Sequence, residues 1–134
     1  MGGKLAEKLI PRLLTRFADR GVRIHAGRHP VATFSASHPE VGELQIDDDD
    51  EELTISVGRL THGHFSPSSY LIPREDREEE VLRRVAAFLD AVFGDRVEFW
   101  TAGKMGGWYV RGENAPMQGP HVRIYAWSGP IVRR

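Results

Sequence analysis

The chain has 134 residues, a formal net charge of −1 and no cysteine. This length fits one domain with its own core, and the neutral balance provides no basic surface for nucleic acid or an anionic membrane. Without cysteine, disulfides, thiol nucleophiles and cysteine-ligated metals are excluded, and a reducing compartment is favoured. No apolar run reaches the ~18 residues that span a bilayer, and the N-terminus lacks a signal-peptide pattern, so we expect a cytoplasmic protein.

The first predicted element is an amphipathic helix near the N-terminus. An apolar residue recurs at every fourth position, at Leu5, Leu9, Leu13 and Phe17. Pro11 interrupts this pattern, because its ring clashes with the carbonyl four residues earlier and it has no N–H to donate. Residues 1–10 are therefore expected to form either a kinked helix or a loose leader.

Short extended segments are expected next, at residues 22–24, 31–34 and 42–46. Residues 52–57 alternate apolar and polar side chains, which is typical of a half-buried strand. The six acids at 47–52 lie between the last two segments and predict a solvated hairpin tip. They do not match a calcium-binding EF-hand loop, because Glu52 and Gly58 occupy the positions that require glycine and glutamate.

The second half begins with the clearest helical pattern, over residues 76–93. Asp76 and Glu79 resemble a capping pair at its start, and Gly94 is a suitable stop. Strands are expected at residues 96–100, 108–111 and 121–127, with a glycine-rich turn over 101–107. Residues 131–134 are expected to be a solvated tail.

The order of these elements predicts the fold class. Two helices, each followed by several strands, favour a single α+β domain over residues 1–134. We expect a mainly antiparallel β-sheet with two amphipathic helices packed on one face.

The sequence "LTHGHF" holds the most conspicuous candidate site. On a strand, His62 and His64 would share one face and both could reach one metal ion. Zinc, nickel or iron normally takes a third protein ligand, and no spacing in the chain nominates one. We therefore expect neither metal nor cofactor, and a structural or partner-facing role for the pair. A metal site on His62 and His64 is the alternative.

A binding patch is the preferred interpretation of this region. Arg59 and His62 near Tyr70 could also bind an anion. Trp108 and Tyr109 are adjacent, so they should point to opposite faces, and an exposed aromatic is a typical binding residue. The candidate binding residues are His62, His64, Tyr70, Trp108, Asp48 and Asp49.

We expect a small accessory protein that works by binding another protein. No serine lies in a nucleophile elbow and no phosphate loop is complete, which argues against an enzyme. An adaptor or the immunity partner of a secreted toxin would be an example. The alternative is a small metal- or histidine-dependent enzyme or sensor that uses His62 and His64. A homodimer formed through an exposed sheet edge or face is a third possibility.

Overall fold

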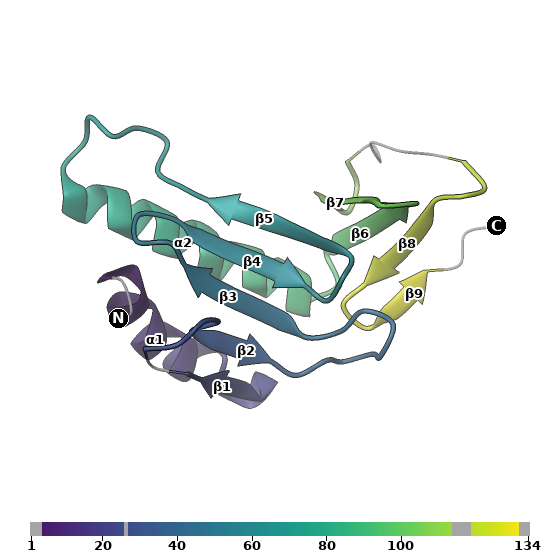
Figure 1. Ribbon diagram of the computed structural model, residues 1–134, viewed down its shortest axis with the longest axis horizontal. Coiled ribbons are helices and arrows are strands. Elements are labelled where there is room, and N and C mark those ends of the chain that lie inside the picture. Colours follow the sequence, from purple (N-terminus) through teal and green to yellow (C-terminus); the bar gives the residue numbers. More distant parts are fainter. Residues whose placement is uncertain (1–3, 26, 114–118, 132–134) are drawn as a thin grey trace.

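The computed structural model describes residues 4–25, 27–113 and 119–131. These residues form two α-helices, a short 3₁₀-helix and nine strands (Figure 1). The order is α1 (Lys4–Arg16), η1 (Ala18–Arg20), β1 (Val22–Ile24), β2 (Ala32–Phe34), β3 (Leu44–Asp48), β4 (Leu53–Val57), β5 (Thr61–Phe65), α2 (Arg74–Phe93), β6 (Val97–Ala102), β7 (Met105–Val110), β8 (Arg123–Ala126) and β9 (Gly129–Ile131).

The strands divide between two antiparallel sheets. The first has the order β1-β2-β3-β4-β5, so that each strand pairs with its neighbours in the chain. The second has the order β7-β6-β8-β9. Figure 1 shows both helices behind the five-stranded sheet. The expected α+β fold is confirmed, with two sheets where a single one was predicted.

The core lies between the five-stranded sheet and the two helices. Alternate residues of β3 and β4 are buried, as the period-two pattern predicts. An aromatic cluster joins β2, α2 and the residue that follows α1, because Phe34 has its ring centroid 6.2 Å from that of Phe17 and 4.9 Å from that of Phe93. Each such side chain contributes roughly 1.5–3 kcal/mol when fully buried.

Helix α1 continues through Pro11, so of the two alternatives for residues 4–10 the helix is present and the loose leader is not. Residues 1–3 lie outside the described part of the chain. Both Pro11 and Glu7, whose carbonyl loses its helical donor, are exposed, so water can hydrate that carbonyl. The buried stripe of Leu5, Leu9 and Leu13 faces the core on the other side of the helix.

Helix α2 begins two residues before its predicted start and ends where Gly94 was expected to stop it. Its N-cap is Pro73, which makes no side-chain capping hydrogen bond, so the predicted capping pair of Asp76 and Glu79 is wrong. The carbonyl of Pro73 instead accepts from the amides of Asp76 and Arg77, both at 3.0 Å. At the other end, the amide of Gly94 donates to the Asp90 carbonyl at 3.0 Å.

The predicted turn over residues 101–107 is much shorter in the structure. Only Gly103 and Lys104 separate β6 from β7. Gly106 and Gly107 belong to β7, where they allow close packing: a Cβ on Gly107 would lie 2.6 Å from the Trp100 indole nitrogen. Strand β9 was not predicted and includes Ile131, the first residue of the expected tail. The other residues of that tail, 132–134, lie outside the described residues.

Neither α1 nor α2, the α-helices of the described residues, combines the length and apolarity that crossing a bilayer would require.

Candidate functional site

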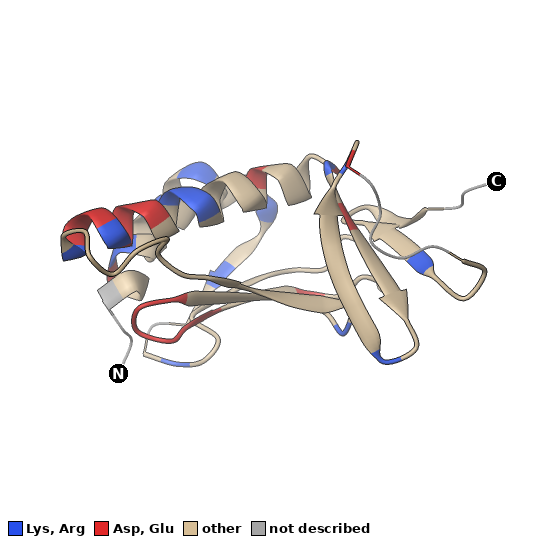
Figure 2. Cartoon of the chain, turned by 90° about the horizontal axis from the view of Figure 1, so that it is seen from above, with Lys and Arg blue, Asp and Glu red and all other residues tan. Residues whose placement is uncertain are grey.

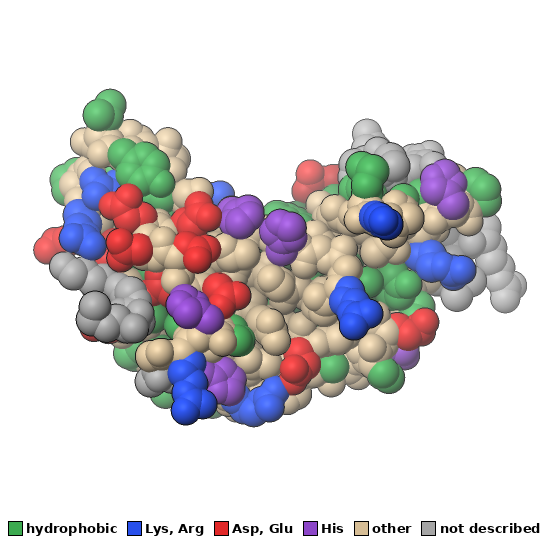
Figure 3. Space-filling model, in the orientation of Figure 1, with side chains coloured by type: hydrophobic (Ala, Val, Ile, Leu, Met, Phe, Trp, Pro, Cys, Tyr) green, Lys and Arg blue, Asp and Glu red, His purple; other side chains and the backbone are tan. Residues whose placement is uncertain are grey.

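The face of the five-stranded sheet that points away from the helices is polar and, except at the buried Thr33, accessible to solvent. Strand register places one row of side chains across all five strands, at Arg23, Thr33, Gln45, Ser56 and His62. A second row contains Asp47, Thr54 and His64. Figure 3 looks onto this face and shows histidines beside a group of acidic side chains.

His62 and His64 share this face, as expected for positions two apart on a strand. They belong to β5, a separate strand that pairs with β4 after a turn through Gly58. Both side chains are exposed, and their rings meet edge to face with centroids 5.3 Å apart. Solvent and any partner therefore have direct access to both imidazoles.

His64 is the centre of a polar network that the sequence analysis missed. Its Nδ1 lies 3.1 Å from Glu52 Oε1 and 3.0 Å from the Thr54 hydroxyl. That hydroxyl in turn donates to Asp49 Oδ2 at 2.9 Å. One ligating atom from each of Asp49, Glu52 and His64 lies within 4.8 Å of the others. Strand register was the one signal that could have revealed this network from the sequence. An antiparallel β4–β5 pair places His64 opposite Thr54, which is two residues from Glu52.

Asp48 differs from the other acids at the tip. It is only 5% exposed, and its carboxylate accepts hydrogen bonds from the amides of Ala6 (2.7 Å) and Asp50 (2.8 Å). The expectation of a wholly solvated acidic tip is therefore wrong at Asp48. Its carboxylate satisfies a free amide in the first turn of α1 and is not part of the exposed surface.

Tyr70 lies in the loop of residues 66–73 and is 56% exposed, beside Leu71 at 96%. Arg77 ties this loop to the acidic tip. Its guanidinium donates to the Ile72 carbonyl at 2.9 Å, lies 5.8 Å from the Tyr70 ring centroid and is 3.5 Å from Glu51. The loop, the tip and the histidines thus form one exposed surface, here called the binding strip: Asp49, Glu51, Glu52, His62, His64, Tyr70 and Leu71.

Trp108 lies outside the binding strip. It is half-buried, and its ring packs edge-on against Phe88 of α2 with centroids 4.7 Å apart. A Cβ on Gly63 would lie 3.1 Å from the Trp108 indole nitrogen, and Gly63 faces the opposite side of β5 from the two histidines. Trp108 and Tyr109 do point to opposite faces, but Trp108 packs against the main core and Tyr109 is buried beside Trp100.

A concavity adjoins His62 at the junction of the two sheets. A cleft of about 450 Å³ is lined by Arg59, Thr61 and His62 on one side and by Lys104 and Gly106 of the β6–β7 hairpin on the other. Arg59 and His62 therefore do line one cavity, as the anion hypothesis requires, and Lys104 joins them. Tyr70 is not part of its lining.

No protein-family model, curated protein or solved structure matches this chain.

Proposed function

We propose that the protein is a cytoplasmic accessory protein that binds another protein through the binding strip. The observation that carries this proposal is the continuity of the strip: Arg77 connects Tyr70 to Glu51, and the next residue, Glu52, contacts His64. Figure 3 shows that the surface is hollowed between the loop of residues 66–73 and the second sheet, next to this strip. The absence of cysteine supports the assignment to a reducing compartment.

The chemistry of the strip indicates the kind of partner. Leu71 is almost fully exposed and Tyr70 more than half, and exposed side chains of this kind serve as apolar anchors in interfaces. Asp49, Glu51 and Glu52 add negative charge to the strip, and Arg77 links Glu51 to Tyr70. Figure 2 shows these acids at the same end of the molecule as the start of α2. A basic surface with an apolar pocket is the complementary partner.

Site-specific photocrosslinking in the source cells tests this proposal. A photoreactive amino acid at position 71 should form one discrete covalent adduct with another polypeptide. The same amino acid at position 14 is the matched control, because Leu14 is also exposed (49%) but belongs to α1, outside the strip. Glu51→Lys should reduce the yield at position 71. Equal adducts at both positions, or none at position 71, would contradict the proposal.

A second candidate function is supported by the grouping of Asp49, Glu52 and His64. One imidazole and two carboxylates are suitable ligands for a divalent ion such as zinc, and they supply the third ligand that the sequence did not nominate. The pairing differs from the one predicted, because His64 joins the two acids and His62 is not in the group. The protein would then be a metal-dependent sensor or enzyme.

Zinc titration by calorimetry separates these two functions, and the two histidines are natural controls for each other. If the metal function holds, the wild type and His62→Ala bind zinc alike, while His64→Ala binds more than about tenfold more weakly because one of the three ligands is missing. Equal loss in both variants would point to a site built on the histidine pair. A wild type that binds no zinc would rule out the metal function.

A further inference from the structure

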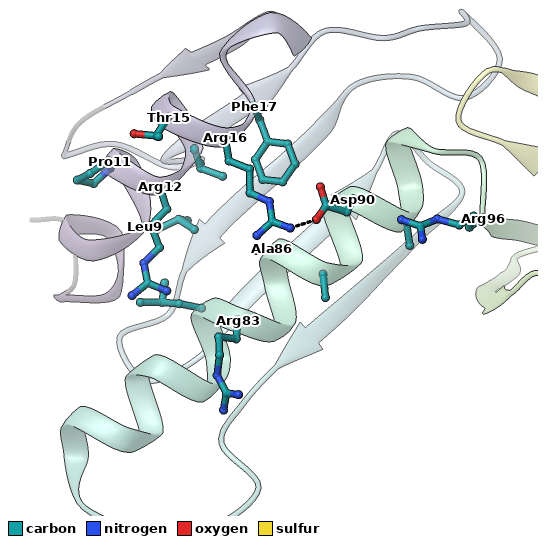
Figure 4. A pocket seen from close by; sticks show the side chains of 14 residues that line it. Leu9, Pro11, Arg12, Thr15, Arg16, Phe17, Arg83, Ala86, Asp90 and Arg96 are labelled. Carbon is teal, nitrogen blue, oxygen red and sulfur yellow. Dashed lines mark hydrogen bonds and ion pairs between the residues drawn. The ribbon is translucent and has the colours of Figure 1, made fainter.

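The open space between α1 and α2 is a cavity that the proposed function does not use. The two helices are joined by three ion pairs, Lys8 with Glu78, Arg12 with Glu79 and Arg16 with Asp90. Beside these pairs lies a cleft of about 660 Å³ (Figure 4). This volume is within the range of roughly 300–1,000 Å³ typical of small-molecule sites.

The floor of the cleft is apolar. Side chains of the core, Leu9, Leu13, Phe17 and Leu82, form its base. On the α2 side three small residues, Ala86, Ala87 and Ala91, line it, which leaves space between the helices. Pro11 and Thr15 complete the lining on the α1 side.

The rim of the cleft is strongly basic. Four arginines are among its lining residues, Arg12, Arg16, Arg83 and Arg96, against a single acid, Asp90. Arg12 and Arg16 are occupied by their ion pairs. Within the described residues, Arg83 and Arg96 make no ion pair within 4.0 Å, although the charge of Arg83 helps to lower the pKa of nearby Glu79.

We propose that this cleft binds a small apolar anion, an alkyl or aryl carboxylate, with its apolar body on the alanine-lined floor and its carboxylate at the arginine rim. Charge complementarity selects the anion, because Arg83 and Arg96 remain positive after Arg12 and Arg16 are paired with Glu79 and Asp90. Arg83 is the expected principal contact, since it lines the cleft, is exposed and makes no ion pair with another residue that the structure describes. Arginine is well suited to this role because its planar fork matches a carboxylate.

The geometry favours a slim ligand over a docked helix. A helix with side chains is about 10–12 Å across. Figure 4 shows Arg12 and Arg16 extending from α1 toward α2, with Arg16 paired to Asp90 across the space that such a helix would occupy. An alkyl chain or a single aromatic ring can lie beside these pairs without breaking them.

Fluorescence of 8-anilinonaphthalene-1-sulfonate, an apolar anion, provides the test. We expect the probe to bind the full-length protein and to be displaced by dodecanoate but not by dodecanol. Ala86→Phe should fill the floor and weaken binding by more than about tenfold. Arg83→Gln should weaken it about fivefold, the upper end for one exposed charge pair. Arg84→Gln is the matched control, because Arg84 is the next residue of α2, is exposed and does not line the cleft.

Each contrary outcome overturns the proposal. Displacement by dodecanol as effectively as by dodecanoate would show that charge is not recognised. Unchanged binding in both Ala86→Phe and Arg83→Gln, with circular dichroism confirming that they fold, would place the probe elsewhere. A concentration-dependent mass that Ala86→Phe abolishes would show that a second copy of the chain covers the cleft. Displacement of the probe only by an acidic amphipathic peptide would show that a partner helix covers the cleft.

Discussion

Asp48 illustrates how a single side chain in an acidic run acquires a structural task. Its neighbours at the hairpin tip are exposed, whereas its carboxylate is buried and accepts two backbone amides. One of these amides, from Ala6, is among the donors that the first turn of a helix leaves unpaired. A negative charge there also complements the positive end of the α1 dipole. Asp48 therefore anchors α1 to the end of β3.

Asp48→Ala should lower the free energy of unfolding by about 2–3 kcal/mol, because it removes a helix cap and leaves two amides without acceptors. Urea denaturation of the purified protein measures this difference. Asp49→Ala is the control, since Asp49 is exposed and its carboxylate accepts a hydrogen bond from the Thr54 hydroxyl, not from the backbone of α1. This substitution should cost less than about 0.5 kcal/mol. Equal losses in the two variants would refute the capping role.

At the scale of elements, α1 and α2 are held together by an apolar floor and a row of exposed ion pairs. The pKa of Glu79 is sensitive to this contact between the helices. This pKa is lowered from the usual value of 4.5, chiefly by the hydrogen bonds that Arg12 donates. A carboxyl whose pKa is lower in the folded state stabilises the fold above its unfolded pKa, and that contribution is lost as the pH falls through the folded value.

Glu79→Gln should therefore destabilise the protein at pH 7 and have no effect at a pH well below 4.5, where the wild-type carboxyl is also neutral. The difference at pH 7 should not exceed about 1 kcal/mol, because the pair is exposed and screened by solvent. Thermal denaturation of both proteins across this pH range measures the difference in stability. In 1 M salt this difference should be smaller, because salt screens the exposed ion pair. Glu40→Gln, a carboxyl outside α1 and α2, should show no such pattern. A difference that persists in acid would assign the effect to packing.

For the whole molecule, local patterns predicted the elements better than their assembly. The apolar stripe of α2 and the alternation of β4 are encoded within one segment, so both were predicted to within two residues. The division into two sheets depends on pairings between distant segments, such as β6 with β8, which no local pattern encodes. The site shows the same limit, because His62 and His64 could be recognised as a pair, whereas Asp49 and Glu52 join His64 only through strand register.

One glycine from each sheet shows how the two sheets are fitted together. Gly106 of β7 approaches the backbone of the β4–β5 turn so closely that a Cβ there would lie 1.9 Å from the Leu60 carbonyl oxygen. Gly63 of β5 leaves the space that the Trp108 indole occupies. The junction that supports the binding strip and the adjoining cleft thus depends on missing side chains, which composition alone does not indicate.

Gly106→Ala should therefore destabilise the whole domain and not only one hairpin. The contact is with backbone, which cannot turn aside as a side chain can, so we expect a loss of about 3 kcal/mol, the upper range for overpacking. Far-ultraviolet circular dichroism and tryptophan fluorescence in urea follow the entire chain and Trp100, Trp108 and Trp127, respectively. The two transitions should coincide at a lower midpoint, because a domain in which both sheets share one junction unfolds as a unit.

Gly103→Asn is the control for this last prediction. Gly103 lies in the same hairpin at φ +63°, has open space around its missing Cβ, and has a left-handed backbone that asparagine tolerates. The free energy of unfolding of the Gly103→Asn variant should stay within about 0.5 kcal/mol of that of the wild type. If Gly106→Ala behaved like this control, the two sheets would not be in close contact at Leu60. If the tryptophan signal alone shifted, the second sheet would unfold independently, and the junction would not join the sheets into one cooperative unit.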